Sequence, residues 1–316
     1  MTSQKIVVLG TGGTIAGTAA AAGDNIGYTA AQVGVAQLLS AIPQLQSQLQ
    51  GRDLVSEQVA QIDSKDMSFA VWAKLAQRCT HWLAQPDVQG IVITHGTDTL
   101  EETAYFLQTV LQANKPVVLT CAMRPATAIA PDGPQNLLDA VALACTSGLQ
   151  GVVAVCAGSV HSALDVQKVH TYRLDAFSSG DAGPLGLVEE GVVRWFRGAP
   201  QAAIESVPFD IARLAGRSAW PRVEIVMNYA GARGAVVDAL VNDGVQGLVV
   251  AATGNGTMHH DLEAALLRAQ AAGVKVLRAT RCATGRVLPK PGDELPDSQG
   301  LSPVKARVAL LLGLLN

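Results

Sequence analysis

Short apolar runs alternate with longer stretches of helical character along most of this chain. The runs are rich in valine and isoleucine, continuous rather than alternating with polar residues, and mostly bounded by glycine or proline. Strands that are covered on both faces have this pattern, so it predicts a mostly parallel sheet between helices, as in an α/β fold. In the first half we expect strands at 5–9, 59–62, 90–94, 116–120 and 151–156, and helices at 31–41, 68–84, 100–112 and 136–146.

The segment 189–217 interrupts this alternation. Glycine and proline recur within it, and it has few clean hydrophobic periods, which is typical of a linker. Beyond it the α/β pattern resumes, with expected strands at 223–227, 247–251 and 274–277 and helices at 261–272 and 304–315. We therefore predict a larger N-terminal domain at 1–188, a linker at 189–217 and a smaller C-terminal α/β domain at 218–316.

Composition argues against several classes of protein. Of the 316 residues, 49% are hydrophobic and 16% are charged, and the formal net charge is −3. Neither disorder nor broad nucleic-acid binding fits these values, because the first needs a high net charge and the second a basic face. The apolar stretch 304–315 is too short to cross about 30 Å of hydrocarbon, so we expect no membrane partner. No secretory signal is visible, which predicts a cytoplasmic protein, or a periplasmic one if a signal peptide has been removed.

The cysteines do not suggest disulfides or a zinc site. They are five, an odd number, and they are widely spaced, with no pair at zinc-ligand spacing. We interpret those in apolar segments as small buried hydrophobic residues, namely Cys121, Cys145 and Cys156.

A glycine-rich turn, GTGGTIA at 10–16, directly follows the first expected strand. Ligands of open α/β sheets bind outside the carboxyl ends of strands, so this turn is a candidate binding loop. A dinucleotide fingerprint would need glycine where Ile15 stands, and the Gly-Lys-Ser/Thr of a phosphate loop is absent. What remains is a flexible turn with two hydroxyls, Thr11 and Thr14, or simply a tight turn in a packed domain.

The segment THGTDTLEETA at 94–104 follows another buried-type strand. Thr99 and Glu102 have capping-box spacing, so a helix is expected to begin here. Thr97 and Asp98 would then lie beside a helix N-terminus, where free N–H groups favour developing negative charge. The alternative is that Asp98 merely caps the helix.

Other polar groups are scattered along the chain, and their spacing alone does not bring them together. Tyr28 lies in a loop rich in glycine and asparagine, Ser64 follows an expected strand, and Lys168 is a lysine in a charge-poor chain. A lysine near a threonine can act as its base, although a solvated surface lysine is the simpler interpretation. No histidine motif and no Gly-x-Ser-x-Gly elbow is present, so threonine is the better candidate nucleophile if the chain is a hydrolase.

Two of these segments resemble signatures of the bacterial L-asparaginase family: TGGTIA at 11–16 and HGTDTLEETA at 95–104. Members of that family hydrolyse L-asparagine and, to varying extents, L-glutamine. Further segments resemble family landmarks in family order: CAMRP at 121–125, DGP at 132–134, GPLG at 183–186, GNG at 254–256 and KARV at 305–308. The resemblance covers nearly the whole chain and implies a two-domain α/β enzyme that needs no cofactor and no metal.

The resemblance implies catalytic roles for five residues. Thr14 would be the nucleophile that attacks the side-chain amide carbon and releases ammonia. Tyr28 would lie over it on a mobile loop and help to activate it. Thr97, Asp98 and Lys168 would form a second threonine-centred group that polarises a hydroxyl or water, with the Thr97 N–H in the oxyanion hole.

Substrate binding is implied for a second set of residues. Asp98 would hold the α-ammonium group and Ser64 the α-carboxylate, and Asn255 lies in a motif near the substrate. Many members have glutamine where this chain has Lys65, and that cation would either strengthen carboxylate binding or point away.

The family is usually a homotetramer, a dimer of dimers in which a neighbour's C-terminal domain completes each active site. The neighbour's acidic residue would lie in the loop at 286–300, with Glu294 as the first match and Asp293 as the second. Thr257 replaces an asparagine of some members and bears on the choice between asparagine and glutamine.

L-asparagine hydrolysis is the leading hypothesis, and two alternatives stay open. One extra methylene is worth only about 1–3 kcal/mol in a pocket, so a glutaminase-asparaginase acting on both amides is plausible. A non-catalytic amino-acid-binding module would have lost a catalytic group, whereas all five remain. A transfer-RNA-linked amidotransferase subunit fits less well, because the chain starts directly at its first strand.

Overall fold

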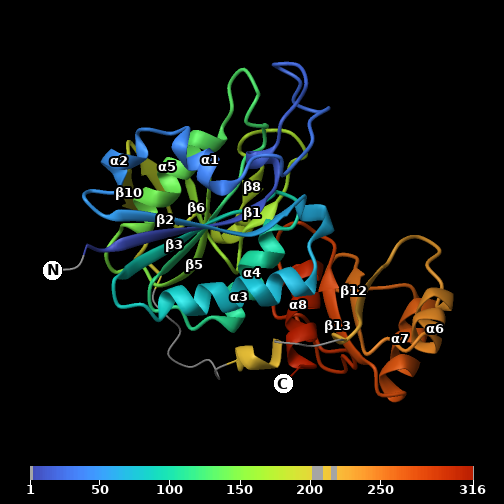
Figure 1. The fold of residues 1–316 in the computed structure, drawn as a ribbon. Helices are drawn as coiled ribbons and strands as arrows, with labels where there is room; N and C mark the ends of the chain where they lie inside the picture. The colour runs from blue at the N-terminus through green and yellow to red at the C-terminus, as the bar shows by residue number, and fades with distance from the viewer. Residues whose placement is uncertain (1–2, 201–208, 215–218, 316) are drawn as a thin grey trace. The chain divides into compact units, whose positions relative to one another are not determined.

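The computed structural model describes residues 3–200, 209–214 and 219–315 (Figure 1). The chain divides into two compact units, Met1–Ala215 and Gly216–Asn316. Four residues of the segment expected as a linker, Val192–Trp195, form the edge strand β10 of the first unit's sheet. Of the rest of that segment, 201–208 and 215–217 lie outside the described residues, as do 1–2, 218 and 316 in the two expected domains.

Within the described residues, the first unit is built on an eight-stranded sheet in the order β10-β9-β6-β5-β4-β3-β1-β2. The pairs from β2 to β5 are parallel and the pairs from β5 to β10 are antiparallel. This arrangement confirms the expected α/β class with a mostly parallel sheet. The strands are β1 Lys5–Gly12, β2 Asp53–Ile62, β3 Val88–Thr94, β4 Pro116–Thr120, β5 Gly151–Cys156, β6 Ser159–Ser162, β9 Gly186–Glu189 and β10 Val192–Trp195.

Helices cover both faces of this sheet (Figure 1). One face packs against α1, α2 and α5, whose leucines, alanines and valines join the sheet's valines in one core cluster. The other face packs against α3 and α4, where the rings of Trp72 and Phe106 stack at 4.8 Å. The bounds are α1 Val35–Ser40, α2 Leu45–Gln48, α3 Phe69–Leu83, α4 Leu100–Val110 and α5 Gly133–Ala144.

The helix expected at 31–41 is shorter than predicted, because α1 begins only at Val35. The N–H groups of residues 31–33 donate instead to the carbonyl oxygens of Gly13 and Ala16, at 2.6–3.0 Å. These bonds tie the preceding loop to the glycine-rich turn. In that loop Ala31 has a φ of +57° and Gly34 is extended, so a right-handed helix cannot run through it. The strand expected at 59–62 is the second half of β2, and α5 begins at Gly133 rather than at 136.

A small hairpin stands apart from the large sheet. The strands β7, Gln167–Lys168, and β8, Phe177–Ser178, form a two-stranded antiparallel sheet of their own among the described residues. In this hairpin Lys168 pairs with Phe177. Sequence reasoning did not predict these strands, because two-residue strands have no recognisable period. The described part of the unit also has four 3₁₀ turns: Thr14–Ala16, Ser64–Asp66, Gly180–Ala182 and Ile211–Leu214.

The second unit, taken by itself, is a three-stranded parallel sheet of described residues in the order β11-β12-β13. Its strands are β11 Val223–Met227, β12 Gly247–Ala252 and β13 Lys275–Thr280. Helices α6 Ala235–Asn242 and α7 His260–Ala271 share a core cluster with the strands, and α8 Pro303–Gly313 also packs on the sheet. Of these strands and helices, α6 is the one that the sequence analysis did not predict. Among the described residues, no helix is long and apolar enough to cross a bilayer.

All five cysteines lie in the described part of the chain and are free thiols. Cys79, Cys121, Cys145 and Cys156 are buried, and Cys282 is exposed. The prediction that Cys121, Cys145 and Cys156 are buried is therefore confirmed. The Cys121 and Cys156 sulfurs lie 3.3 Å apart at the ends of β4 and β5, and their contact, with burial, raises the pKa of the Cys121 thiol.

The strand order 2-1-3-4-5 fixes where a ligand site belongs. The connection from β1 leads to β2 on one side, and the next strand, β3, lies on the other side of β1. The order in which strands are added to the sheet therefore reverses between β1 and β3. Open α/β sheets bind ligands at such a switch point. The two threonine segments follow these two strands.

Candidate active site

The loops after β1 and β3 meet backbone to backbone. Gly13 has a φ of +83°, and a Cβ built on it would lie 2.3 Å from the Cα of Gly96. A Cβ on Gly96 would lie 2.5 Å from the Ser64 hydroxyl. Only glycine permits this approach and this conformation, so the two glycines bring Thr14 and Thr97 into one site.

Thr14 is in contact with Tyr28. The Thr14 Oγ1 and the Tyr28 hydroxyl lie 2.7 Å apart, and either oxygen can donate. Thr14 is 7% exposed, on the 3₁₀ turn that follows β1. Tyr28 reaches it from the loop between that turn and α1, where Thr18 and Thr29 form an antiparallel bridge. A threonine hydroxyl with a second hydroxyl at this distance has a route for its proton.

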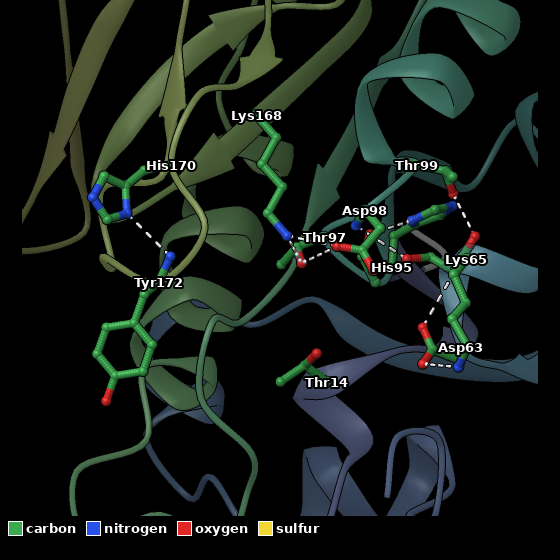
Figure 2. A network of polar contacts seen from close by, with 12 residues as sticks. Thr14, Asp63, Lys65, His95, Thr97, Asp98, Thr99, Lys168, His170 and Tyr172 are labelled. Carbon is green, nitrogen blue, oxygen red and sulfur yellow. Dashed lines mark hydrogen bonds and ion pairs between the residues drawn. The ribbon is translucent and has the colours of Figure 1, made fainter. Parts of the chain in front are cut away.

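Thr97, Asp98 and Lys168 form a second group (Figure 2). The Lys168 Nζ donates to the Thr97 Oγ1 at 2.8 Å and to the Asp98 Oδ1 at 2.6 Å. The lysine comes from the β7–β8 hairpin, and the other two residues come from the loop between β3 and α4. The structure therefore brings together three residues that the spacing alone left apart.

Asp98 does not serve as the helix cap. Its carboxylate binds Lys168 through Oδ1, and its other oxygen has no hydrogen-bond partner among the described residues. The Asp98 side chain is 53% exposed, so that oxygen is open to a cation from solution. The N–H of Thr97 likewise has no acceptor within the described part of the chain. One anionic acceptor and one backbone donor thus remain for a ligand.

Ser64 joins the loop after β2 to the same place. Its hydroxyl accepts from the Asp98 N–H at 3.1 Å, and its carbonyl oxygen accepts from the Thr99 hydroxyl at 2.8 Å. Helix α4 begins after Thr99 as predicted, but the Thr99 side chain makes no capping bond, because it binds Ser64 instead. Ser64 is 2% exposed, beneath Gly96.

Lys65 turns toward the acidic residues of its own turn. Its Nζ lies 2.7 Å from Asp63 and 3.8 Å from Asp66, and 62% of the side chain is exposed. The Asp63 hydrogen bond raises the pKa of Lys65, so the lysine keeps its charge. Figure 2 shows this pair at the edge of the site, away from the Lys168 group. Sequence reasoning overlooked Asp63, although it precedes Ser64 directly.

His95 is a fully buried residue of the second signature. Its Nδ1 bonds to the Gly96 carbonyl oxygen at 2.7 Å, and its Nε2 has no partner within the described residues. Burial disfavours the imidazolium and lowers the pKa of His95 to about 4. A neutral ring with Nδ1 as donor therefore holds the turn before Thr97. The position of His95 inside the signature, directly after a buried strand, is the sequence feature from which this structural role could have been predicted.

The remaining predicted residues lie in the second unit. The Asn255 amide is occupied, since it donates to the Leu288 carbonyl at 3.1 Å and accepts from the Leu288 N–H at 2.7 Å. Asp293 is bound by Arg278, which lowers the pKa of Asp293 to about 2. The Glu294 side chain is exposed and has no partner among the described residues. Of the two acids, Glu294 is the one free to act outside its own unit.

The described residues contain one cluster with metal-ligand types, His259, His260 and Asp261 at the start of α7. The two rings are stacked at 4.3 Å, so their in-plane lone pairs run side by side instead of converging. The His259 Nδ1 already accepts the Asp261 N–H. This cluster does not fit a metal ion, and its three residues belong to the second unit.

The comparisons with known proteins agree with this geometry. The asparaginase N-terminal domain model matches residues 5–201, and the glutaminase/asparaginase C-terminal domain model matches residues 222–316. A two-domain α/β chain with paired threonine loops at the switch point is thus an asparaginase-type protein. The chain belongs to the asparaginase family.

Three relatives illustrate the similarity. L-asparaginase 2 of Escherichia coli (strain K12) is 39% identical over 98% of this chain and 88% of its own. The glutaminase-asparaginase of Pseudomonas fluorescens biotype A is 36% identical over 98% of this chain and 86% of its own. The crystal structure of a probable cytoplasmic L-asparaginase from Campylobacter jejuni has a TM-score of 0.92 at 39% identity, covering 99% of this chain and 95% of that one.

Proposed function

We propose that this chain is an amidohydrolase that converts L-asparagine to L-aspartate and ammonia through a threonine nucleophile. One observation carries the proposal: two threonine hydroxyls on touching loops each have a polar partner within 2.8 Å. For Thr14 the partner is Tyr28, and for Thr97 it is Lys168. Family membership supports the reaction type.

In the first step the Thr14 oxygen attacks the side-chain amide carbon. Tyr28 accepts the Thr14 proton and passes its own proton to the leaving nitrogen, which departs as ammonia and leaves a threonine ester. The Thr97 N–H, which has no acceptor among the residues that the structure describes, supports an oxyanion site for the intermediate, because a preorganised donor stabilises charge that develops there.

In the second step water attacks the ester, restores the Thr14 hydroxyl and releases the carboxylate. The Lys168–Thr97–Asp98 group would polarise this water. The substrate's α-ammonium fits the open oxygen of Asp98, and its α-carboxylate would bind at the turn of Ser64. Lys65 is held by Asp63 and is not offered as a direct ligand.

A glutaminase-asparaginase is the second candidate. Among the relatives described above, two are named for asparagine alone and one for both amides, and all three match nearly the whole chain. Thr257, whose N–H and carbonyl pair with Thr253 at 2.9 Å, replaces the asparagine that we associate with the choice between amides. A binding module without catalysis remains the outcome if neither amide is turned over.

We further propose a homotetramer, a dimer of dimers, in which Glu294 of a neighbouring copy completes each site. Support comes from the exposed Glu294 carboxylate, which has no partner in the described part of the chain, and from the two hydrogen bonds between Asn255 and Leu288 of the same loop. We also propose a cytoplasmic location, because the similar Campylobacter jejuni protein is named a probable cytoplasmic L-asparaginase.

The test is ammonia release from L-asparagine and, separately, from L-glutamine. Wild type is compared with Thr14→Ala and with a control, Thr109→Ala, whose exposed hydroxyl bonds only within α4. Asparagine turnover that is lost in Thr14→Ala and kept in Thr109→Ala supports the proposal. An active Thr14→Ala variant refutes the nucleophile, and comparable turnover of both amides favours the second candidate.

A further inference from the structure

Lys168 stands on an element that the main sheet does not hold by backbone ladders. The β7–β8 hairpin is a separate two-stranded sheet with two residues in each strand. A two-stranded hairpin alone is marginally stable. Something outside the hairpin therefore has to fix the position of Lys168.

A buried hydrogen bond ties this hairpin to the large sheet. The His161 Nδ1 and the Ser179 Oγ lie 2.9 Å apart. His161 is on β6, where it pairs with Ala154 of β5, and Ser179 directly follows β8. The two side chains are 3% and 5% exposed. We propose that His161 and Ser179 are positioning residues that hold Lys168 against Thr97 and Asp98; the proposal rests on the function proposed above.

The short path between the anchor and the lysine supports this role. Ser179 follows Ser178, which pairs with Gln167, and Gln167 precedes Lys168. A shift of Ser179 is therefore passed to Lys168 through one pair of the ladder. The anchor at the other end is rigid, because β6 lies between two neighbours in the eight-stranded sheet.

Apolar packing alone would not fix the hairpin so closely. Phe177 of β8 is buried, as are Val166 and Ala176, which directly precede the two strands, and this burial opposes removal of the hairpin from the domain. Apolar burial is non-directional, however, and tolerates sliding. A hydrogen bond between two nearly inaccessible groups has a set length and direction, and it opposes a slide of the hairpin.

Lys168 needs this precision. Its Nζ makes contacts of 2.6 and 2.8 Å with two different side chains, so a small displacement breaks at least one of them. Misplacement of a catalytic group by about 1 Å can cost about 100-fold in rate. A residue that acts through Lys168 is expected to change kcat more than KM.

The first experiment measures kcat and KM for L-asparagine in His161→Leu, Ser179→Ala and the double variant. We expect each single variant to lose about 10- to 100-fold in kcat, and the double variant to lose no more than either single one. His161→Asn, whose amide reaches the place of Nδ1, is expected to restore most of kcat. Ser159→Ala, on the same strand, is the control.

A purely structural role predicts another pattern. The melting temperature would fall, the losses in the double variant would add, and kcat of the folded enzyme would stay at the wild-type value. That pattern, or a failure of His161→Asn to exceed His161→Leu in kcat, overturns the proposal.

The second experiment does not depend on turnover. An amine-selective N-hydroxysuccinimide ester modifies lysines, and peptide mass spectrometry gives the rate at Lys168 relative to exposed Lys275. The Lys168 side chain is 19% exposed, so release of the hairpin should raise its relative rate in His161→Leu and Ser179→Ala. An unchanged rate overturns the inference even if the wild type hydrolyses no amide, whereas a wild type without amidase activity refutes only the proposed function.

Discussion

Two glycines with the same positive φ offer a test of the loop contact that forms the site. Gly13 and Gly51 both have a φ of +83°. A Cβ on Gly13 would lie 2.3 Å and 2.4 Å from the Gly96 backbone, whereas one on Gly51 would meet nothing within 4 Å. Alanine at either position bears the strain of a positive φ, and alanine in place of Gly13, whose ψ is −171°, also meets the Gly96 backbone.

The expected magnitudes follow from these two contributions. The strain of a positive φ costs an alanine about 1–3 kcal/mol. Overpacking adds about 1–3 kcal/mol, because the atoms in the way are backbone and cannot rotate aside. We therefore expect Gly51→Ala to lose about 1–3 kcal/mol of unfolding free energy and Gly13→Ala about 2–6 kcal/mol.

The assay is thermal and urea unfolding followed by tryptophan fluorescence. Trp72, Trp82 and Trp195 belong to the first unit and only Trp220 to the second, so the signal reports mainly the unit that contains the contact. The melting temperature of a unit of this size falls by about 2–4 °C for each kcal/mol of unfolding free energy that is lost. Equal shifts for Gly13→Ala and Gly51→Ala would refute the close approach, and so would full amidase activity in Gly13→Ala.

Three other predictions concern the side chains of the site. Lys168→Met should lower kcat by about 10²–10⁴-fold in the ammonia assay, with circular dichroism unchanged. Tyr28→Phe should lower kcat by about 10²-fold and leave KM within a few-fold, since it removes only the proton route. The pKa of His95 is lowered from 6.5 to about 4, so between these pH values His95 is protonated in the unfolded chain and neutral in the folded one. The contribution of His95 to the free energy of unfolding is complete above about pH 6.5 and falls by about 3 kcal/mol as the pH drops toward 4. In melting temperatures measured from pH 4 to 8, His95→Asn should therefore show a weaker decrease toward low pH than the wild type.

The pattern of buried strands was enough to predict the α/β class and most parallel strands. The strands 116–120, 151–156 and 223–227 have the observed bounds, because continuous valine and isoleucine runs between glycines and prolines permit little else. The helix expected at 31–41 was too long, because 31–33 donate to the distant carbonyl oxygens of Gly13 and Ala16 in a loop where Ala31 has a positive φ and Gly34 is extended. Such long-range competition leaves no local trace in sequence.

The candidate site was predictable in part. The motifs placed Thr14 and Thr97 after strands, and the strand order then explains why they meet. Lys168 belongs to a two-residue strand with no period of its own, so the residues alone favoured a surface lysine and only the resemblance gave it a role. The diversion of Lys65 to Asp63 depends on side-chain conformation, which the spacing of residues does not encode.

The distribution of the thiols allows each folded chain to be labelled at one site. Four of the five cysteines are buried, and Cys282 alone is exposed. A maleimide dye added to the folded chain should therefore attach at a single point, without any engineered cysteine. That point lies a few residues before the 286–300 loop, which carries Glu294 and is proposed to reach a neighbouring copy. Mixing donor- and acceptor-labelled preparations would turn subunit exchange into an energy-transfer signal, and dilution would show how fast the assembly comes apart.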